Sequence, residues 1–81
     1  MYKCTIQIDG MACGMCEAHV NSAVRKVINA KKVTSSHKKG TTEIIAQVID
    51  EVALKKAIEE TGYRVLSIKT ENYVKKGLFS F

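Results

Sequence analysis

Cys13 and Cys16 are the residues of this chain whose type and spacing could do chemistry. They lie in the segment at residues 10–16, which reads GMACGMC and stands between an alternating segment and a stretch with helical spacing. The N–H groups at the start of a helix have no partner within the helix and favour anions, and therefore thiolates. A thiolate is the form of cysteine that binds metal. The motif therefore predicts two thiolates that converge on one soft metal ion.

The number of ligands indicates which metal this site would take. A structural zinc site usually has about four ligands, and only two clustered donors are evident in this sequence. Soft thiolates in low number suit Cu(I). Zinc, cadmium and mercury stay open as alternatives, and zinc would need ligands from a partner or a second copy. The chain is expected to be a monomer, with a metal-bridged dimer of four thiolates as an open alternative.

Three further residues are predicted to surround the dithiol. Met11 is expected to turn into the core and brace the loop. Tyr63 stands at the start of the last predicted strand, and this start should lie beside the dithiol. An aromatic ring at that place would shield the ion from water. His19 lies one helical turn after Cys16. We expect it to face solvent, and a role as a third ligand stays open.

The third cysteine, Cys4, shares the inward phase of Ile6 and Ile8 and is predicted to be a buried structural thiol. An odd cysteine count suits no disulfide framework, and the chain shows no apolar run of signal-peptide or membrane-span length. These features favour a reducing, cytoplasmic compartment. The chain also has no proline, whereas a thioredoxin-like fold holds a cis-proline against its dithiol. A dithiol oxidoreductase is therefore the weaker alternative, and we expect no enzyme.

The elements that must position the motif follow from hydrophobic periodicity. Residues 4–8 alternate as a strand with one buried face. From Cys16 the period becomes helical, with one face formed by Val20, Ala23, Val24, Val27 and Ile28. Strands are expected at residues 32–37, at an edge, and 42–49, at the centre. A second helix should begin after the N-cap Asp50 and end at Gly62, and a fourth strand should cover residues 63–69.

The order βαββαβ predicts a ferredoxin-like α/β (α+β) sandwich with two helices on one face. Its antiparallel sheet should have the spatial order 4-1-3-2, although we expect the two central strands, the first and the third, to run parallel to each other. The 81 residues fit one domain at 1–70. Residues 71–81 form a basic and aromatic tail that should be loosely ordered.

The basic balance of the chain is concentrated in one stretch. The chain carries 13 basic and 8 acidic residues, for a net charge of +5. Six positive charges without an intervening acid lie between Arg25 and Lys39. They either steer an acidic protein partner or form an ordinary solvated face. Nucleic acid is not expected as a partner, because the predicted sheet lacks the paired aromatics that stack bases. Membrane contact is expected only through a partner, with the tail as an open alternative.

The sequence resembles the heavy-metal-associated (HMA) domain family in three features over residues 2–70: the Gly-Met-x-Cys-x-x-Cys motif at 10–16, the first helix and Gly62-Tyr63. That family comprises bacterial and other copper chaperones and the N-terminal metal-binding domains of P-type metal-transporting ATPases. The resemblance implies that Cys13 and Cys16 bind Cu(I) and that Met11 is the family's buried loop methionine. Tyr63 matches the tyrosine common in bacterial copper chaperones. The tail and residues 28–30 depart from the usual pattern.

The expected function is therefore a cytoplasmic metal-binding domain that delivers Cu(I) by ligand exchange. The expected partner is a copper-transporting P-type ATPase or another metal-handling protein. A sensor or transporter regulatory domain for zinc, cadmium or mercury is the alternative.

Overall fold

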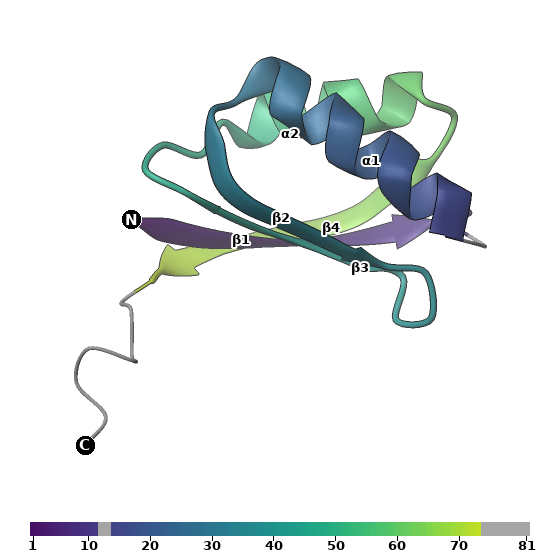
Figure 1. Cartoon of the computed structure of the whole chain (residues 1–81), viewed down its shortest axis with the longest axis horizontal. Coiled ribbons are helices and arrows are strands. Elements are labelled where there is room, and N and C mark those ends of the chain that lie inside the picture. Colours follow the sequence, from purple (N-terminus) through teal and green to yellow (C-terminus); the bar gives the residue numbers. More distant parts are fainter. Residues whose placement is uncertain (12–13, 74–81) are drawn as a thin grey trace.

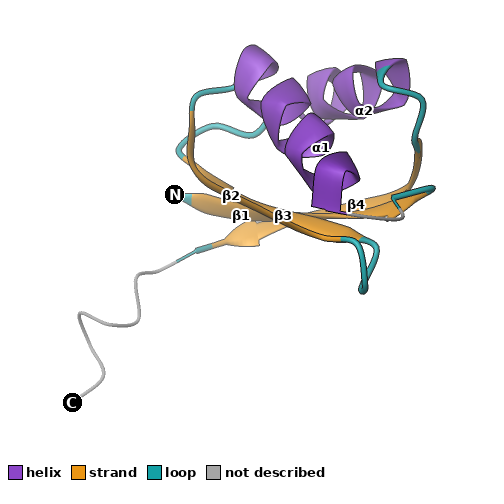
Figure 2. Cartoon of the chain, turned by 45° about the vertical axis from the view of Figure 1, so that its right-hand side comes forward, coloured by secondary structure: helices purple, strands orange, loops and turns teal. Residues whose placement is uncertain are grey.

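The computed structural model describes residues 1–11 and 14–73. Six elements follow one another: β1 (Tyr2–Asp9), α1 (Gly14–Val27), β2 (Ala30–Ser36), β3 (Thr41–Ala46), α2 (Glu51–Glu60) and β4 (Arg64–Asn72). Both helices lie on the same face of one sheet (Figures 1 and 2). The predicted ferredoxin-like βαββαβ sandwich is confirmed.

The four strands form a sheet of order β2-β3-β1-β4, which is the predicted spatial order. Every strand pair is antiparallel. The expectation that the two central strands run parallel is wrong, since β1 pairs antiparallel with β3, with Cys4 opposite Ile44. The cause is the connectivity. The crossover through α1 makes β2 run in the direction of β1, and the turn after β2 then reverses the chain into β3.

The core lies between the sheet and the helices. Alternation places Cys4, Ile6 and Ile8 of β1 on the covered face, where they are 0–4% exposed. The helices contribute fully buried side chains at helical spacing, namely Val20, Val24, Leu54 and Ile58. The predicted inward position of Val27 is wrong, because this last residue of α1 is 41% exposed and lines a groove between α1 and α2.

Two strand ends differ from the prediction. β3 ends at Ala46, and Val48, which continues the apolar run, is 73% exposed after the chain has left the sheet. β4 instead continues past residue 69 to Asn72, which pairs with Tyr2. The N–H of Tyr73 then donates to the C=O of Met1 at 3.0 Å. The rest of the predicted tail, residues 74–81, lies outside the described residues.

The second helix has the two ends that its sequence predicts. A side-chain oxygen of Asp50 accepts a hydrogen bond from the N–H of Ala53 at 3.1 Å. At the other end Gly62 has a φ of 102°, and its N–H donates to the C=O of Glu59 at 3.0 Å. A glycine is suited to this left-handed conformation, which turns the chain from α2 into β4. No helix in the described part of the chain is long and apolar enough to cross a membrane.

The burial pattern of α2 predicts the cost of truncating its buried face. Leu54 is 0% exposed and Val52 is 80% exposed. We expect Leu54→Ala to lower the free energy of unfolding by about 2–5 kcal/mol, through lost burial and the cavity left behind. The matched control Val52→Ala should change it by less than about 0.5 kcal/mol. Urea unfolding followed by circular dichroism would measure both, and equal losses would contradict this core.

Candidate metal centre

The motif segment connects the end of β1 to the start of α1, at the end of the sheet that also carries the β2–β3 turn (Figure 1). The helix begins at Gly14, two residues before the predicted start. Cys16 therefore lies in its first turn, partly buried and packed against the core. Cys13, the other predicted ligand, lies outside the described residues. The convergence of the two thiols on one ion stays a prediction.

Met11 anchors the start of this segment in the core. Its side chain is 5% exposed and belongs to the cluster of buried residues that includes Ile8 and Val20. This is the placement that the sequence predicts for it. Met11 therefore ties the motif segment to the apolar layer between sheet and helices, and its support of a bound ion stays a prediction.

Tyr63 lies beside the motif segment, close to Gly10. A Cβ atom added to Gly10 would lie 3.5 Å from the Cδ1 atom of Tyr63, and Gly10 has a φ of 101°. A residue with a side chain would be strained in this conformation. The strand pairing explains why Tyr63 lies close to Gly10, because Asp9 at the end of β1 is opposite Arg64 at the start of β4. The tyrosine therefore lies beside Gly10, at the start of the motif segment, and its shielding of an ion stays a prediction.

Two other side chains near the motif, one of them the candidate His19, are exposed. Met15 is 71% exposed, and His19 is exposed and lines the groove between α1 and α2 together with Lys26 and Glu60. Within residues 1–11 and 14–73, no three histidine, cysteine or acidic side chains gather closely enough to hold a metal ion. The prediction that His19 faces solvent is confirmed, and its role as a third ligand stays an untested alternative.

Cys4 lies away from the motif, inside the core. It is 0% exposed and stands opposite Ile44 and Thr70 on the neighbouring strands. Burial raises the pKa of its thiol, although a hydrogen bond with Thr70 acts in the opposite direction. The prediction that Cys4 is a buried thiol is confirmed.

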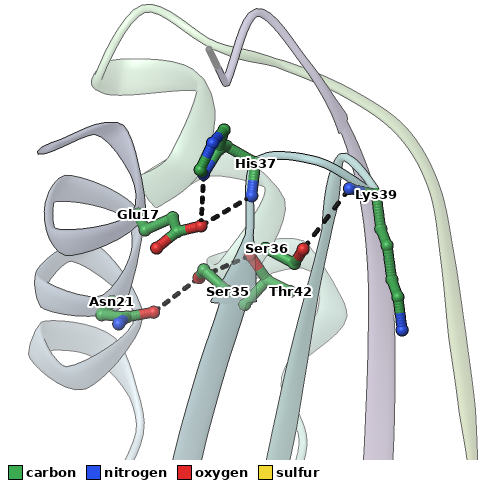
Figure 3. Close-up of polar contacts among 7 residues, drawn as sticks. All are labelled: Glu17, Asn21, Ser35, Ser36, His37, Lys39 and Thr42. Carbon is green, nitrogen blue, oxygen red and sulfur yellow. Dashed lines mark hydrogen bonds and ion pairs between the residues drawn. The ribbon is translucent and has the colours of Figure 1, made fainter. Parts of the chain in front are cut away.

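The sequence gives no role to His37, but the structure connects it to the motif helix. Its N–H and its ring Nδ1 both bind Oε2 of Glu17, each at 2.7 Å (Figure 3). These bonds hold the pKa of the Glu17 carboxyl below its ordinary value of 4.5. Twenty residues separate the partners, so no local periodicity relates them. The only sequence signal is an acid directly after the motif and a histidine directly after β2.

A second polar link lies one helical turn further along α1. The hydroxyl of Ser35 donates to the side-chain oxygen of Asn21 and lies 2.9 Å from the hydroxyl of Thr42. Thr42 is fully buried, and no buried side-chain nitrogen or oxygen in the described residues lacks a hydrogen-bond partner. The seam between α1 and the β2–β3 hairpin is therefore closed by polar bonds (Figure 3).

Comparison with known proteins defines the class to which this fold and motif belong. The model of the heavy-metal-associated domain family matches residues 5–64. The chain belongs to this family, whose members are metal-binding domains, and the predicted resemblance is confirmed.

The individual relatives differ in the metal that their names mention. The chain is 38% identical over 72 residues to a mercuric reductase of Lysinibacillus sphaericus. The aligned region covers 85% of this chain but only 13% of that protein. A solved putative copper-ion-binding protein from Bacillus anthracis str. Ames is 28% identical, with a TM-score of 0.70 over 80% of this chain and 96% of that one. A CopZ metallochaperone structure is 24% identical, with a TM-score of 0.73 over 79% and 98% of the two chains, and shows the shared fold.

The different surroundings of the cysteines predict different reactivity. Cys4 is fully buried with a raised thiol pKa, whereas Cys16 is partly exposed in the first helical turn. In the native metal-free protein we expect iodoacetamide to modify Cys16 at least about tenfold faster than Cys4, because the thiolate is the reacting form. Peptide mass spectrometry over time would measure both rates. Equal rates in the folded protein, with urea-unfolded protein as the control, would contradict the burial of Cys4.

The lowered pKa of Glu17 predicts a pH-dependent contribution to stability. Its folded state favours the ionised form, so the contribution is present above the ordinary carboxyl pKa and is lost as the pH falls through the lowered value. Glu17→Gln should therefore lower the melting temperature at pH 7, and the difference from wild type should shrink towards pH 3. Thermal unfolding at several pH values would test this. A difference that is the same at pH 7 and pH 3 would contradict it, and Glu60→Gln, an exposed acid on α2, is the matched control.

Proposed function

We propose that this chain binds Cu(I) through Cys13 and Cys16 and delivers it to the thiolates of a partner protein. The observation that carries the proposal is the placement of Cys16, partly buried, in the first turn of α1, within the range that the family model matches. Two thiolates suit the low coordination number of Cu(I). The similarity to a putative copper-ion-binding protein supports this choice of ion.

The proposed transfer is a ligand exchange without redox change. A partner thiolate bonds to the two-coordinate ion, and the bond to one of the chain's own cysteines then breaks. The released thiolate takes up a proton, which balances the proton lost by the incoming thiol. A second exchange completes the transfer with copper still as Cu(I). Fixed anchors on both sides, Met11 and Tyr63, would keep the segment positioned while the ion changes ligands.

The expected partner is a metal-transporting P-type ATPase or another metal-handling protein, in the cytoplasm. A solved copper-binding domain of HMA7, a P-type ATPase, shares this fold at 22% identity. We propose a binding and delivery role rather than catalysis, because the proposed transfer needs no acid, base or redox group beyond the exchanging thiols.

Mercury is the second candidate ion, and a specific observation favours it. The chain is 38% identical to a segment of a mercuric reductase, and Hg(II) is also a soft ion that suits thiolates. Native mass spectrometry of the protein with Cu(I), Hg(II) and Zn(II) in competition would separate the candidates. Retention of copper at one ion per chain would support the first proposal, and replacement of copper by zinc would overturn it.

Substitution of the three cysteines tests which of them hold the ion. We expect Cys13→Ser and Cys16→Ser each to weaken Cu(I) binding by at least about a thousandfold, because each removes one of two soft ligands. Cys4→Ser should change the affinity by less than about threefold, since Cys4 lies in the core and outside the motif. Competition with a Cu(I) chelator would measure the dissociation constants. Equal losses in all three variants would contradict the assignment.

A further inference from the structure

Most of the large exposed apolar side chains gather at one end of the molecule, opposite the motif segment (Figure 1). One row of paired residues crosses the sheet there, Ala30, Ala46, Tyr2 and Asn72 in spatial order. α1 ends and α2 begins within five residues of this row, and we call this region the distal end. It carries five of the seven large apolar residues that are exposed in the described part of the chain: Met1, Tyr2, Val27, Val48 and Val52.

The apolar side chains of the distal end form a continuous surface. Two adjoining hollows share Val48, which is 73% exposed between them. The first hollow extends towards α1 and is lined by Val27 and Ile28. The second extends towards β1 and is lined by Tyr2 and Ile49. A contiguous exposed apolar surface usually marks a contact site.

Cations accompany this apolar surface. The fold divides the basic stretch that the sequence places between Arg25 and Lys39. Two of its members, Lys38 and Lys39, follow β2 in the turn at the opposite end of the sheet. The other four are exposed at the distal end, in the last turn of α1 and at the start of β2: Arg25, Lys26, Lys31 and Lys32.

The acids at the distal end do not neutralise these four cations. Asp50 caps the first turn of α2, and Glu51 accepts a hydrogen bond from the hydroxyl of Thr70. Glu71 stands opposite Lys3 in the sheet. The ion pairs within the described residues involve none of the four cations. Their charge is therefore available to an anionic partner.

Projecting apolar side chains beside unneutralised cations suit the surface of an anionic bilayer. Val48 and Val52, at 73% and 80%, are the most exposed large apolar residues of the described chain. Side chains that project this far can enter the boundary between headgroups and acyl chains, while lysine and arginine attract the anionic headgroups. Tyr2 is of a type that is common at membrane interfaces. An acidic protein surface would match the cations only and leave the projecting valines without an apolar counterpart.

We propose that the distal end is a docking surface for membranes that contain anionic lipids. Val48 and Val52 enter the bilayer boundary, and the four cations lie at the headgroups. The motif segment is at the opposite end of the sheet (Figure 1), so docking holds this segment away from the lipid. The inference uses no residue of the motif and is independent of which ion the chain binds.

Co-sedimentation of the full chain with lipid vesicles tests the role of the cations. We expect binding to vesicles of phosphatidylcholine with about one-third phosphatidylglycerol, and none to pure phosphatidylcholine. The double variant Lys31→Gln with Lys32→Gln should bind at least about tenfold more weakly, because each cation near an anionic surface contributes to binding. Lys38→Gln with Lys39→Gln is the matched control. It removes the same net charge at the opposite end and should change binding by less than about threefold.

A second pair of variants tests the apolar contact. Val48→Ser should weaken vesicle binding by about fivefold, because an apolar side chain no longer leaves water. Leu66→Ser, at another exposed position near the start of β4, should change it by less than about twofold. The chain has no tryptophan, so Val48→Trp adds a local fluorophore. Brominated lipids should quench its fluorescence and leave that of Leu66→Trp unchanged, and circular dichroism would check that every variant is folded.

Several results would overturn the proposal. One is the absence of binding to the anionic vesicles, and another is an equal loss in the two lysine double variants, which would show an effect of net charge alone. Unchanged binding in both Val48→Ser and the Lys31→Gln, Lys32→Gln variant would place the contact elsewhere in the chain, residues 74–81 included. A loss with the lysine variant alone, with Val48→Trp unquenched, would indicate an electrostatic surface that fits an acidic protein instead.

Discussion

The structure depends on the pairing of β1 between β3 and β4. This central strand buries one face, Cys4, Ile6 and Ile8, against the helices, and its antiparallel register fixes which residues of its neighbours lie beside it. Because β1 ends at Asp9, the same register brings the start of β4 next to the motif segment. The position of Tyr63 near Gly10 thus follows from backbone pairing that begins at the opposite end of the sheet.

The proposed exchange of the ion would place two conflicting requirements on the site. The ligands must be reachable by incoming thiolates, yet the segment that carries them needs a defined position. Contacts at the start of the segment and beside it would meet the second requirement. Met11 is buried in the core at the start of the segment, and Tyr63 lies beside Gly10. Glu17, in the first turn of α1, binds His37 in the β2–β3 hairpin. Next to these contacts, the side chain of Met15 faces solvent.

Most of the fold could be predicted because local patterns determine it. The alternation of β1, the N-cap Asp50 and the glycine after α2 each act within a few residues, and the order of the elements leaves few topologies. Errors arose where tertiary packing decides. Val48 continues an apolar run but lies beyond the end of β3, and Val27 has helical phase but lies at the end of α1. The bond between Glu17 and His37 depends on the docking of α1 on the hairpin, which no local pattern encodes.

The pairing of Tyr2 with Asn72 and the hydrogen bond from Tyr73 to Met1 place both ends of the described chain at the same end of the sheet. The motif segment connects β1 to α1 at the opposite end of the sheet (Figure 1). A tether attached at either end would therefore leave the segment pointing away from its attachment point. Such a domain could be fused in series, or fixed to a surface, and still present its cysteines to a second molecule. Linker length would then set the local concentration of the domain near its partner.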